Sequence, residues 1–223
     1  MTDVRDNPVW HSLTGAHAHL GSRHGRAARY APEVSPFAAL SDPADLAAWD
    51  DLEVLLGGAV AVLTPVSEVP DGWTVTRRIE GLQMVDVAVG ATPDPEAVPL
   101  GPDDVPEMLD LVARTEPGPF VRRTVEMGGY VGIRESGRLV AMAGRRFQPA
   151  GWAEVSAVCT DPDFQGRGLG ARVVRTVIAG VRADGGQALL HVMASNTGAI
   201  GLYVKLGFEI RRECSFVLVN KPE

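Results

Sequence analysis

The stretch Gln165-Gly166-Arg167-Gly168-Leu169-Gly170-Ala171 lies at the centre of the segment that decides the fold. An apolar run containing Val155 and Val158 precedes it. Apolar residues follow it at helical spacing: Leu169, Val173, Val174, Val177, Ile178 and Val181. The order predicts a strand, a short polar loop, a glycine-rich turn and a helix. Because glycines leave backbone N–H groups uncovered at a helix N-terminus, where the helix dipole also attracts anions, the segment predicts a phosphate-binding site.

Bulk composition indicates a globular protein of one large domain or two small ones. The chain has 223 residues, of which 45% are hydrophobic and 22% are charged. Its net charge of −7 argues against nucleic acid or an anionic membrane as a partner. The N-terminus lacks a signal-peptide pattern, and no apolar run approaches the roughly 18 residues that span a bilayer. We therefore expect a cytoplasmic protein, either a monomer or a homodimer.

Neither the cysteines nor the histidines form a recognisable metal site. The two cysteines, Cys159 and Cys214, lie in apolar, strand-like runs and are expected to be small buried residues. His17 and His19 flank one residue, but no carboxylate or thiolate follows them at ligand spacing. We expect no bound metal.

The first region, residues 1–91, is divided by prolines into short pieces. We expect a short helix at Ala44–Trp49 and strands at Leu52–Leu56, Ala59–Leu63 and Leu82–Val87. The proline-rich segment Ala91–Pro95 is the best candidate boundary. The sequence thus predicts an N-terminal lobe of residues 1–91 and a catalytic domain of residues 92–223.

The second region reads as one helix, three antiparallel strands, the glycine-rich turn with its helix, and a closing segment. The helix starts at Gly101–Val105, and the strands are Gly128–Arg134, Leu139–Phe147 and Trp152–Thr160. Beyond the turn, Ala188–Met193 is expected to pair in parallel with Glu154–Thr160, since a helix connects them. Ser195 and Asn196 are good N-cap residues for a short helix that ends at Gly207, and Phe208–Val219 closes the sheet.

Two other phosphate-binding patterns fit the glycines less well. Gly166-x-Gly168-x-x-Ala171 matches a dinucleotide fingerprint, but Asp161–Phe164 separates it from the strand. The next strand also ends in Met193–Asn196, without the acid that such a site needs for ribose. No Gly-Lys-Ser/Thr follows, so a P-loop is excluded.

The glycine turn together with its downstream segment resembles the GNAT superfamily of N-acetyltransferases. The resemblance is carried by Gln165-x-x-Gly168-x-Gly170 and by Asn196-x-x-Ala199-x-x-Leu202-Tyr203-x-Lys205-Leu206-Gly207-Phe208, which cover most of the last third. The first lobe is similar to the degenerate GNAT-like half of two-lobed members, without any motif. The resemblance implies an α/β fold (an α+β mixed sheet) in which a central, largely antiparallel sheet is splayed at a parallel strand pair.

The resemblance also implies acetyl-CoA as co-substrate. The pyrophosphate would lie on the backbone of the glycine turn, and the pantetheine amides would pair with a strand edge. The implied contact residues are Val158, Cys159, Thr160, Gln165, Gly166, Arg167, Gly168, Leu169, Gly170, Ala171, Asn196 and Tyr203. Arg172 would either reach the coenzyme phosphates or remain solvated.

The expected reaction is transfer of an acetyl group to a primary amine of a small molecule or peptide. Tyr203 stands where the family places the acid for the departing thiolate, since a phenol of pKa ~10 suits a thiol; the alternative is a packing aromatic. Glu154 is the candidate base, with a water chain as the alternative. The backbone N–H of Val158 would polarise the thioester carbonyl. A non-catalytic acyl-CoA-binding module is the competing hypothesis.

Overall fold

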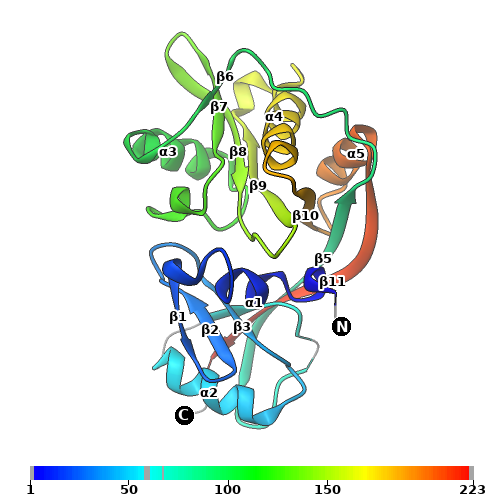
Figure 1. Cartoon of the computed structure of the whole chain (residues 1–223). Coiled ribbons are helices and arrows are strands. Elements are labelled where there is room, and N and C mark those ends of the chain that lie inside the picture. Colours follow the sequence, from blue (N-terminus) through cyan, green and yellow to red (C-terminus); the bar gives the residue numbers. More distant parts are fainter. Residues whose placement is uncertain (1–2, 58–60, 67, 221–223) are drawn as a thin grey trace.

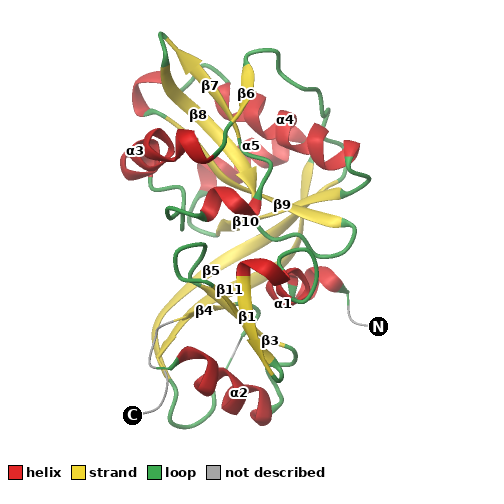
Figure 2. Ribbon diagram, turned by 60° about the vertical axis from the view of Figure 1, so that its left-hand side comes forward, coloured by secondary structure: helices red, strands yellow, loops and turns green. Residues whose placement is uncertain are grey.

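The computed structural model describes residues 3–57, 61–66 and 68–220. Its strands form one mixed sheet in the order β1-β2-β3-β4-β11-β5-β10-β9-β8-β7-β6. Two lobes lie one above the other, and the long strands β5 (Thr74–Asp86) and β11 (Phe208–Asn220) run between them (Figures 1 and 2). The sheet is therefore continuous from one lobe to the other.

The remaining elements follow in chain order. The α-helices are α1 (Pro8–Leu13), α2 (Leu46–Leu56), α3 (Val105–Thr115), α4 (Leu169–Ala183) and α5 (Thr197–Leu206). The short 3-10 helices are η1 (Val4–Asp6), η2 (Ala18–Leu20), η3 (Pro102–Asp104), η4 (Thr124–Met127) and η5 (Pro162–Phe164). The other strands are β1 (Gly21–His24), β2 (Ala27–Tyr30), β3 (Phe37–Leu40), β4 (Ala61–Leu63), β6 (Ala97–Pro99), β7 (Val131–Glu135), β8 (Arg138–Arg145), β9 (Trp152–Thr160) and β10 (Gln187–Met193).

The upper lobe confirms the predicted mixed sheet with a splayed parallel pair. Strand β10 runs parallel to β9, but the pairing covers only Gln187–Leu189 against Trp152–Glu154. Beyond that point the two strands separate, while β8 continues to pair with β9 as far as Thr160. We call this point of separation the fork.

Helices cover both faces of the upper sheet. The apolar stripe of α4 is buried along its whole length, from Leu169 to Val181, and packs with α5 on one face. Helix α3 covers the other face through Met108 and Leu111. Figure 1 shows α4 and α5 side by side, and α3 on the opposite side. This packing holds the start of α4 at the carboxyl end of β9.

The lower lobe corrects one prediction. Leu52–Leu56 is not a strand but the second half of α2, because Trp49, Leu52 and Leu56 recur at helical spacing and are buried on one face. A short apolar run does not distinguish a buried strand from a buried helix turn. Of the predicted strand Ala59–Leu63, the structure describes 61–63 as β4, and residues 59 and 60 lie outside the described residues. The predicted strand Leu82–Val87 is the last part of the longer β5.

Strand β5 links the two predicted regions. It precedes the boundary expected at residue 91, yet it pairs with β10 on one side and β11 on the other. The division into two independent domains stays a prediction.

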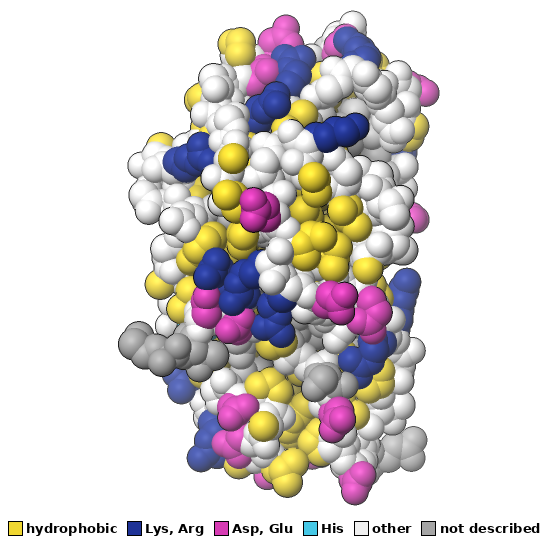
Figure 3. Space-filling view, turned by 90° about the vertical axis from the view of Figure 1, so that its right-hand side faces the viewer, with side chains coloured by type: hydrophobic (Ala, Val, Ile, Leu, Met, Phe, Trp, Pro, Cys, Tyr) yellow, Lys and Arg dark blue, Asp and Glu magenta, His cyan; other side chains and the backbone are white. Residues whose placement is uncertain are grey.

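The surface carries charges of both signs. On the face that Figure 3 shows, basic and acidic side chains of the described residues lie in small groups around a hydrophobic area near the middle. Within the ranges the structure describes, no helix is long and apolar enough to cross a membrane.

Candidate functional site

The glycine turn leaves an open surface at the start of α4. Gly166 and Gly168 have φ of +76° and +75°, a region that favours glycine, and a Cβ on either would meet no atom within 4 Å. No side chain caps α4, whereas Asn7, Asp45 and Asn196 cap α1, α2 and α5. The first backbone N–H groups of α4 therefore face open space, as an anion site requires.

The first turn of α4 is held against the elements on either side of it. A Cβ on Gly170 would lie 3.6 Å from Thr160 Oγ1 and 3.8 Å from Leu202 Cδ2. Gly170 thus lies between the end of β9 and helix α5. The glycine turn and the helix that carries Tyr203 are held together by this packing.

Both arginines near the turn have acidic partners. Arg167 pairs with Glu135 and lies over the Phe164 ring at 5.3 Å. The guanidinium of Arg172 donates two hydrogen bonds to Asp94, at 2.6 and 2.8 Å, and also pairs with Glu96. In this structure Arg172 fastens the segment before β6 to α4.

Strand β9 bulges just beyond the fork. It places one extra residue between Ser156 and Cys159 opposite β8, and Ala157 has a φ of +51°. A non-glycine residue in this region is strained, and such bulges re-aim the backbone of a strand. Val158 follows directly. The predicted contact strand Val158–Thr160 is therefore the part of β9 that is unpaired with β10 and rotated by the bulge.

A buried carboxylate anchors the loop that follows β9. Asp161 is 1% exposed, and it pairs with Arg114 at 2.9 Å and Arg138 at 2.5 Å. Its other oxygen accepts from the backbone N–H of Asp163 at 3.0 Å. From the sequence, Asp161 was expected only to be part of the spacer between the strand and the glycines. Its position directly before a proline, at the end of a strand, was the available signal.

Helix α5 presents the two remaining predicted residues. Asn196 caps the helix, accepting from the N–H of Ala199 at 3.1 Å. Tyr203 is buried and packs edge-to-face on Phe208, with ring centroids 5.8 Å apart. Burial, followed by the charges of Cys159 and Glu154, raises the pKa of Tyr203 to about 12. The phenol therefore keeps its proton at neutral pH.

Glu154 lies at the last paired position before the fork and is fully buried. Its Oε1 accepts from Arg146 Nη2 at 2.5 Å and lies 3.0 Å from His191 Nδ1, while Oε2 has no hydrogen-bond partner. Burial by itself would raise the pKa of Glu154, but Arg146 and His191 outweigh it and lower that pKa to about 2. The carboxylate is ionised at neutral pH.

Three residues of this network were not predicted from the sequence: Arg146 and His191, which contact Glu154, and Gln83, which contacts His191. His191 and Gln83 are single polar residues inside apolar strands, whereas Arg146 follows Arg145 at the end of β8. Gln83 is 2% exposed and lies next to His191, 3.0 Å apart between their Nε2 atoms. A lone polar residue on the inward-facing side of a strand was the only signal.

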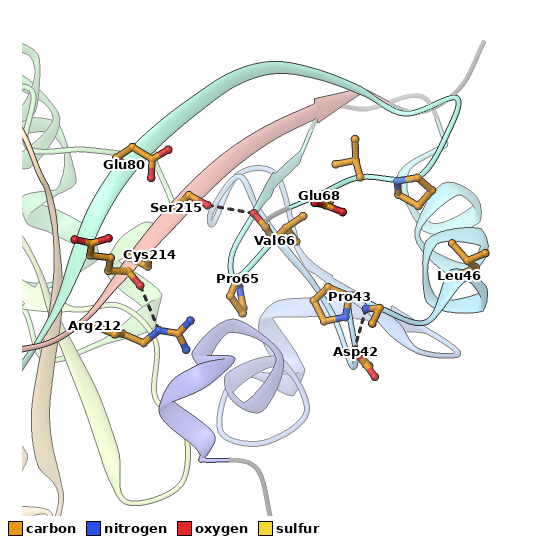
Figure 4. A pocket seen from close by; sticks show the side chains of 14 residues that line it. Asp42, Pro43, Leu46, Pro65, Val66, Glu68, Glu80, Arg212, Cys214 and Ser215 are labelled. Carbon is orange, nitrogen blue, oxygen red and sulfur yellow. Dashed lines mark hydrogen bonds between the residues drawn. The ribbon is translucent and has the colours of Figure 1, made fainter.

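Two surface cavities stand out among the described residues, and neither is lined by Glu154, Tyr203 or the glycine turn. The larger, about 680 Å³, lies between the start of α2, the loop after β4 and the strands β5 and β11 (Figure 4). Four carboxylates line it: Asp42, Glu68, Glu80 and Glu213. Within the described ranges, no three His, Cys, Asp or Glu side chains are grouped closely enough to hold a metal ion.

Comparison with known proteins gives consistent matches. The profile of the family described as FR47-like protein matches residues 130–217. The crystal structure of a putative GNAT-family acetyltransferase from Novosphingobium aromaticivorans superposes with a TM-score of 0.89 at 42% sequence identity, and the match covers 100% of both chains.

Two curated relatives match over shorter segments. The N-alpha-acetyltransferase RimI of Mycobacterium tuberculosis is 39% identical over 84 residues, which are 36% of this chain and 51% of RimI. A mycothiol acetyltransferase of Saccharopolyspora erythraea is 42% identical over 64 residues, 28% of this chain and 21% of that protein. The chain thus matches about half the length of one curated relative and a fifth of the other.

Proposed function

This chain belongs to the GNAT family of acetyltransferases, and we propose that it moves an acetyl group from acetyl-CoA to a primary amine of a small molecule or peptide. The observation that carries this proposal is the fork between β9 and β10, with the uncapped glycine turn at the carboxyl end of β9 and the buried, protonated Tyr203 on the neighbouring helix α5. A nicotinamide site is disfavoured because Asp161–Phe164 separates the glycines from strand β9 and no acid follows β10.

The glycine turn fits the pyrophosphate of acetyl-CoA. Gly166 and Gly168 leave room for phosphate oxygens, and the N–H groups of Leu169, Gly170 and Ala171 supply donors at the positive end of the helix dipole. Gln165, Arg167 and Asn196 are the flanking residues that the GNAT resemblance adds to these contacts. Arg167 would have to exchange Glu135 for phosphate in order to take part.

The unpaired part of β9 fits the pantetheine arm. From Val158 to Thr160 its backbone no longer pairs with β10, so its N–H and C=O groups can pair with amides. Beyond the bulge at Ala157, the Val158 N–H is the candidate donor to the thioester carbonyl. Such a donor acts on the negative charge that develops on that oxygen as the amine attacks.

Tyr203 supplies the proton that the leaving group needs. The amine nitrogen forms a bond to the acetyl carbon, the carbon–sulfur bond breaks, and the phenol donates its proton to the departing thiolate. The amine proton would pass to Glu154, whose buried Oε2 has no hydrogen-bond partner, or to a water chain. Because Arg146 and His191 lower the pKa of Glu154, this carboxylate is a weak base, and the water chain is the alternative to it.

The charge around the larger cavity supports an amine as acceptor. Its lining holds four carboxylates and one arginine, Arg212, whose guanidinium already donates to Asp6 at 3.0 Å. Arg78 lies beside the cavity and donates to Val66 O at 3.3 Å and to Ser215 Oγ at 3.2 Å. Cys214 lines the same cavity, and burial, followed by the charge of Glu154, raises the pKa of its thiol to about 11. The excess of carboxylates in its lining would favour a cationic amine over an anion in this cavity.

Tyr203→Phe is the decisive variant. We expect it to bind acetyl-CoA with native affinity in calorimetric titration but to release thiol about 10²- to 10⁴-fold more slowly with a good amine. Amines, amino acids, peptides and polyamines should be screened first with the native protein. Trp73→Phe is the control, since it reduces a buried aromatic side chain that packs on Trp49 in the lower lobe.

The outcomes separate the hypotheses. Unchanged thiol release in Tyr203→Phe would exclude this tyrosine as the acid. Binding of acetyl-CoA by the native protein without turnover on any amine would favour the non-catalytic acyl-CoA-binding module. Binding of a nicotinamide dinucleotide but not of acetyl-CoA would overturn the cofactor assignment.

A further inference from the structure

A chain of hydrogen bonds runs from the buried Glu154 to the N-terminal segment. His191 lies between Glu154 and Gln83, with its Nδ1 3.0 Å from Glu154 Oε1 and its Nε2 3.0 Å from Gln83 Nε2. The Gln83 amide in turn contacts Arg5 and Arg211. Arg211 continues to Asp6 at 2.7 Å.

The contacts of Gln83 determine which way its amide points. Its nitrogen donates to the Arg5 carbonyl oxygen at 2.8 Å, and its oxygen accepts from Arg211 Nη1 at 2.7 Å. The reversed amide would put two oxygens together at Arg5 and two donors together at Arg211. Only one orientation is therefore satisfied at both ends.

That orientation decides the tautomer of His191. The second N–H of the Gln83 amide points at His191 Nε2, so this nitrogen must accept and carries no proton. The imidazole proton is then on Nδ1, where it donates to Glu154 Oε1. An imidazolium would place two donors against each other at Gln83.

We infer that Gln83 locks His191 as the neutral Nδ1–H tautomer, and that both are positioning residues for the Glu154 carboxylate. Oε1 is saturated by Arg146 and His191, so Oε2, which is buried and has no partner, is the carboxylate atom left to accept a proton. The role toward the amine rests on the proposed function. The tautomer assignment does not, because it follows from the hydrogen bonds alone.

The charges around Glu154 agree with this arrangement. The titratable groups facing it come from several elements: Arg146, His191, Tyr30, Tyr130, Tyr203 and Cys214. Burial raises the pKa of each of the three tyrosines and of the thiol, so these groups are neutral. With His191 neutral by its hydrogen bonds, Arg146 is the one fixed cation among these groups, and His191 acts on Glu154 as a hydrogen-bond donor.

The first test reads the tautomer directly, by the ¹⁵N chemical shifts of the His191 ring, assigned with the His191→Asn variant. In the native protein at neutral pH we expect one protonated nitrogen, Nδ1. In Gln83→Glu the new carboxylate accepts from Nε2, so we expect both nitrogens to be protonated. Gln187→Glu, which adds the same charge at an exposed position on β10, should keep the native shifts. An Nε2–H tautomer or an imidazolium in the native protein would overturn the inference.

The second test measures the consequence for the reaction. In Gln83→Glu the His191 imidazolium is a second cation beside Glu154, and a nearby cation lowers the pKa of a carboxylate by about 1–3 units. Glu154 becomes a weaker base, so we expect kcat to fall at least about tenfold while KM for acetyl-CoA is unchanged. His191→Asn keeps a donor near Nδ1, while His191→Phe keeps only the ring. We expect His191→Phe to lose about 100-fold in kcat/KM for the amine and His191→Asn to recover most of it.

These outcomes are distinguishable from a failure of the proposed function. If the native protein acetylates no amine, the proposed function is wrong and the kinetic test no longer applies. The ¹⁵N chemical shifts of the His191 ring then still decide the tautomer. If the native protein is active and His191→Asn is no better than His191→Phe, His191 is not a positioning residue.

Discussion

Gly168 has a positive φ, which favours glycine, and it also lies at the proposed phosphate site. One pair of variants separates these two properties. Its φ of +75° is tolerated by Asn and Asp better than by other side chains. Gly168→Asn and Gly168→Asp therefore share shape and strain but differ in charge. The carboxylate would occupy the anion site and repel phosphate. We expect Gly168→Asp to weaken acetyl-CoA binding about 10- to 100-fold more than Gly168→Asn in calorimetric titration, as loss of charge-assisted hydrogen bonds predicts.

The matching control lies at the other end of α4. Gly185 has a φ of +77° and open space around it, but it faces no proposed ligand. Gly185→Asp and Gly185→Asn should bind acetyl-CoA equally well. Equal affinities for the two Gly168 variants would mean that the pyrophosphate is held elsewhere.

Residues were predictable from the sequence where their role is local. Gly166 and Gly168 are needed by a turn whose conformation depends on its own few residues, and Asn196 caps the helix that directly follows it. Glu154 was found as a candidate, but its partners were not. Arg146 and His191 reach it only through the pairing of β9 with β8 and β10, which no local pattern encodes.

Helix α4 is fastened to the segment before β6 by Arg172, and this contact makes a prediction at the level of elements. The side chain of Asp94 is 15% exposed, and the Arg172 guanidinium lowers its pKa to about 2. A carboxyl whose pKa is depressed on folding contributes stability above its ordinary pKa, and that contribution is lost as pH falls through the lowered value. We expect the difference in unfolding free energy between native protein and Asp94→Asn to shrink as pH falls from about 4 to 2. Denaturant titration at each pH measures it.

Arg172→Gln tests the same contact from the other side. If Arg172 holds the segment rather than the coenzyme, this variant loses about 1 kcal/mol of stability and keeps its affinity for acetyl-CoA. Arg175→Gln removes an exposed arginine from the same helix and should change neither quantity. A loss of affinity confined to Arg172→Gln would instead assign this arginine to the phosphates.

Helices and strands were predicted best where apolar residues recur with one period over a long segment, because such a pattern fits only one type of secondary structure. The stripe of α4 runs from Leu169 to Val181 and was identified as a helix, whereas Leu52–Leu56 is too short to show its period and was wrongly assigned as a strand. The bulge at Ala157 had no signal at all, since alanine is not a residue that prefers its backbone conformation.

At the scale of the whole molecule, the two lobes share strands rather than a linker. Strand β5 lies between β10 and β11, and β11 continues into the lower lobe, where Val217 and Val219 join its core. The chain of hydrogen bonds that starts at Glu154 and passes through His191 and Gln83 also ends in the N-terminal segment, at Arg5 and Asp6. The lower lobe thus completes the sheet and the surroundings of the fork.

The fragment 92–223 is therefore expected not to fold by itself. Without β5 both β10 and β11 lose a hydrogen-bonded neighbour, and the apolar faces of β11 that pack on the lower lobe are exposed. We expect the full chain to unfold in one cooperative denaturant transition, and the fragment to show no near-ultraviolet circular dichroism and no cooperative transition. Mixing it with fragment 1–91 should restore both, since the two pieces together supply every strand of the sheet. A fragment 92–223 that unfolds cooperatively and binds acetyl-CoA would instead establish an independent domain beginning near residue 92.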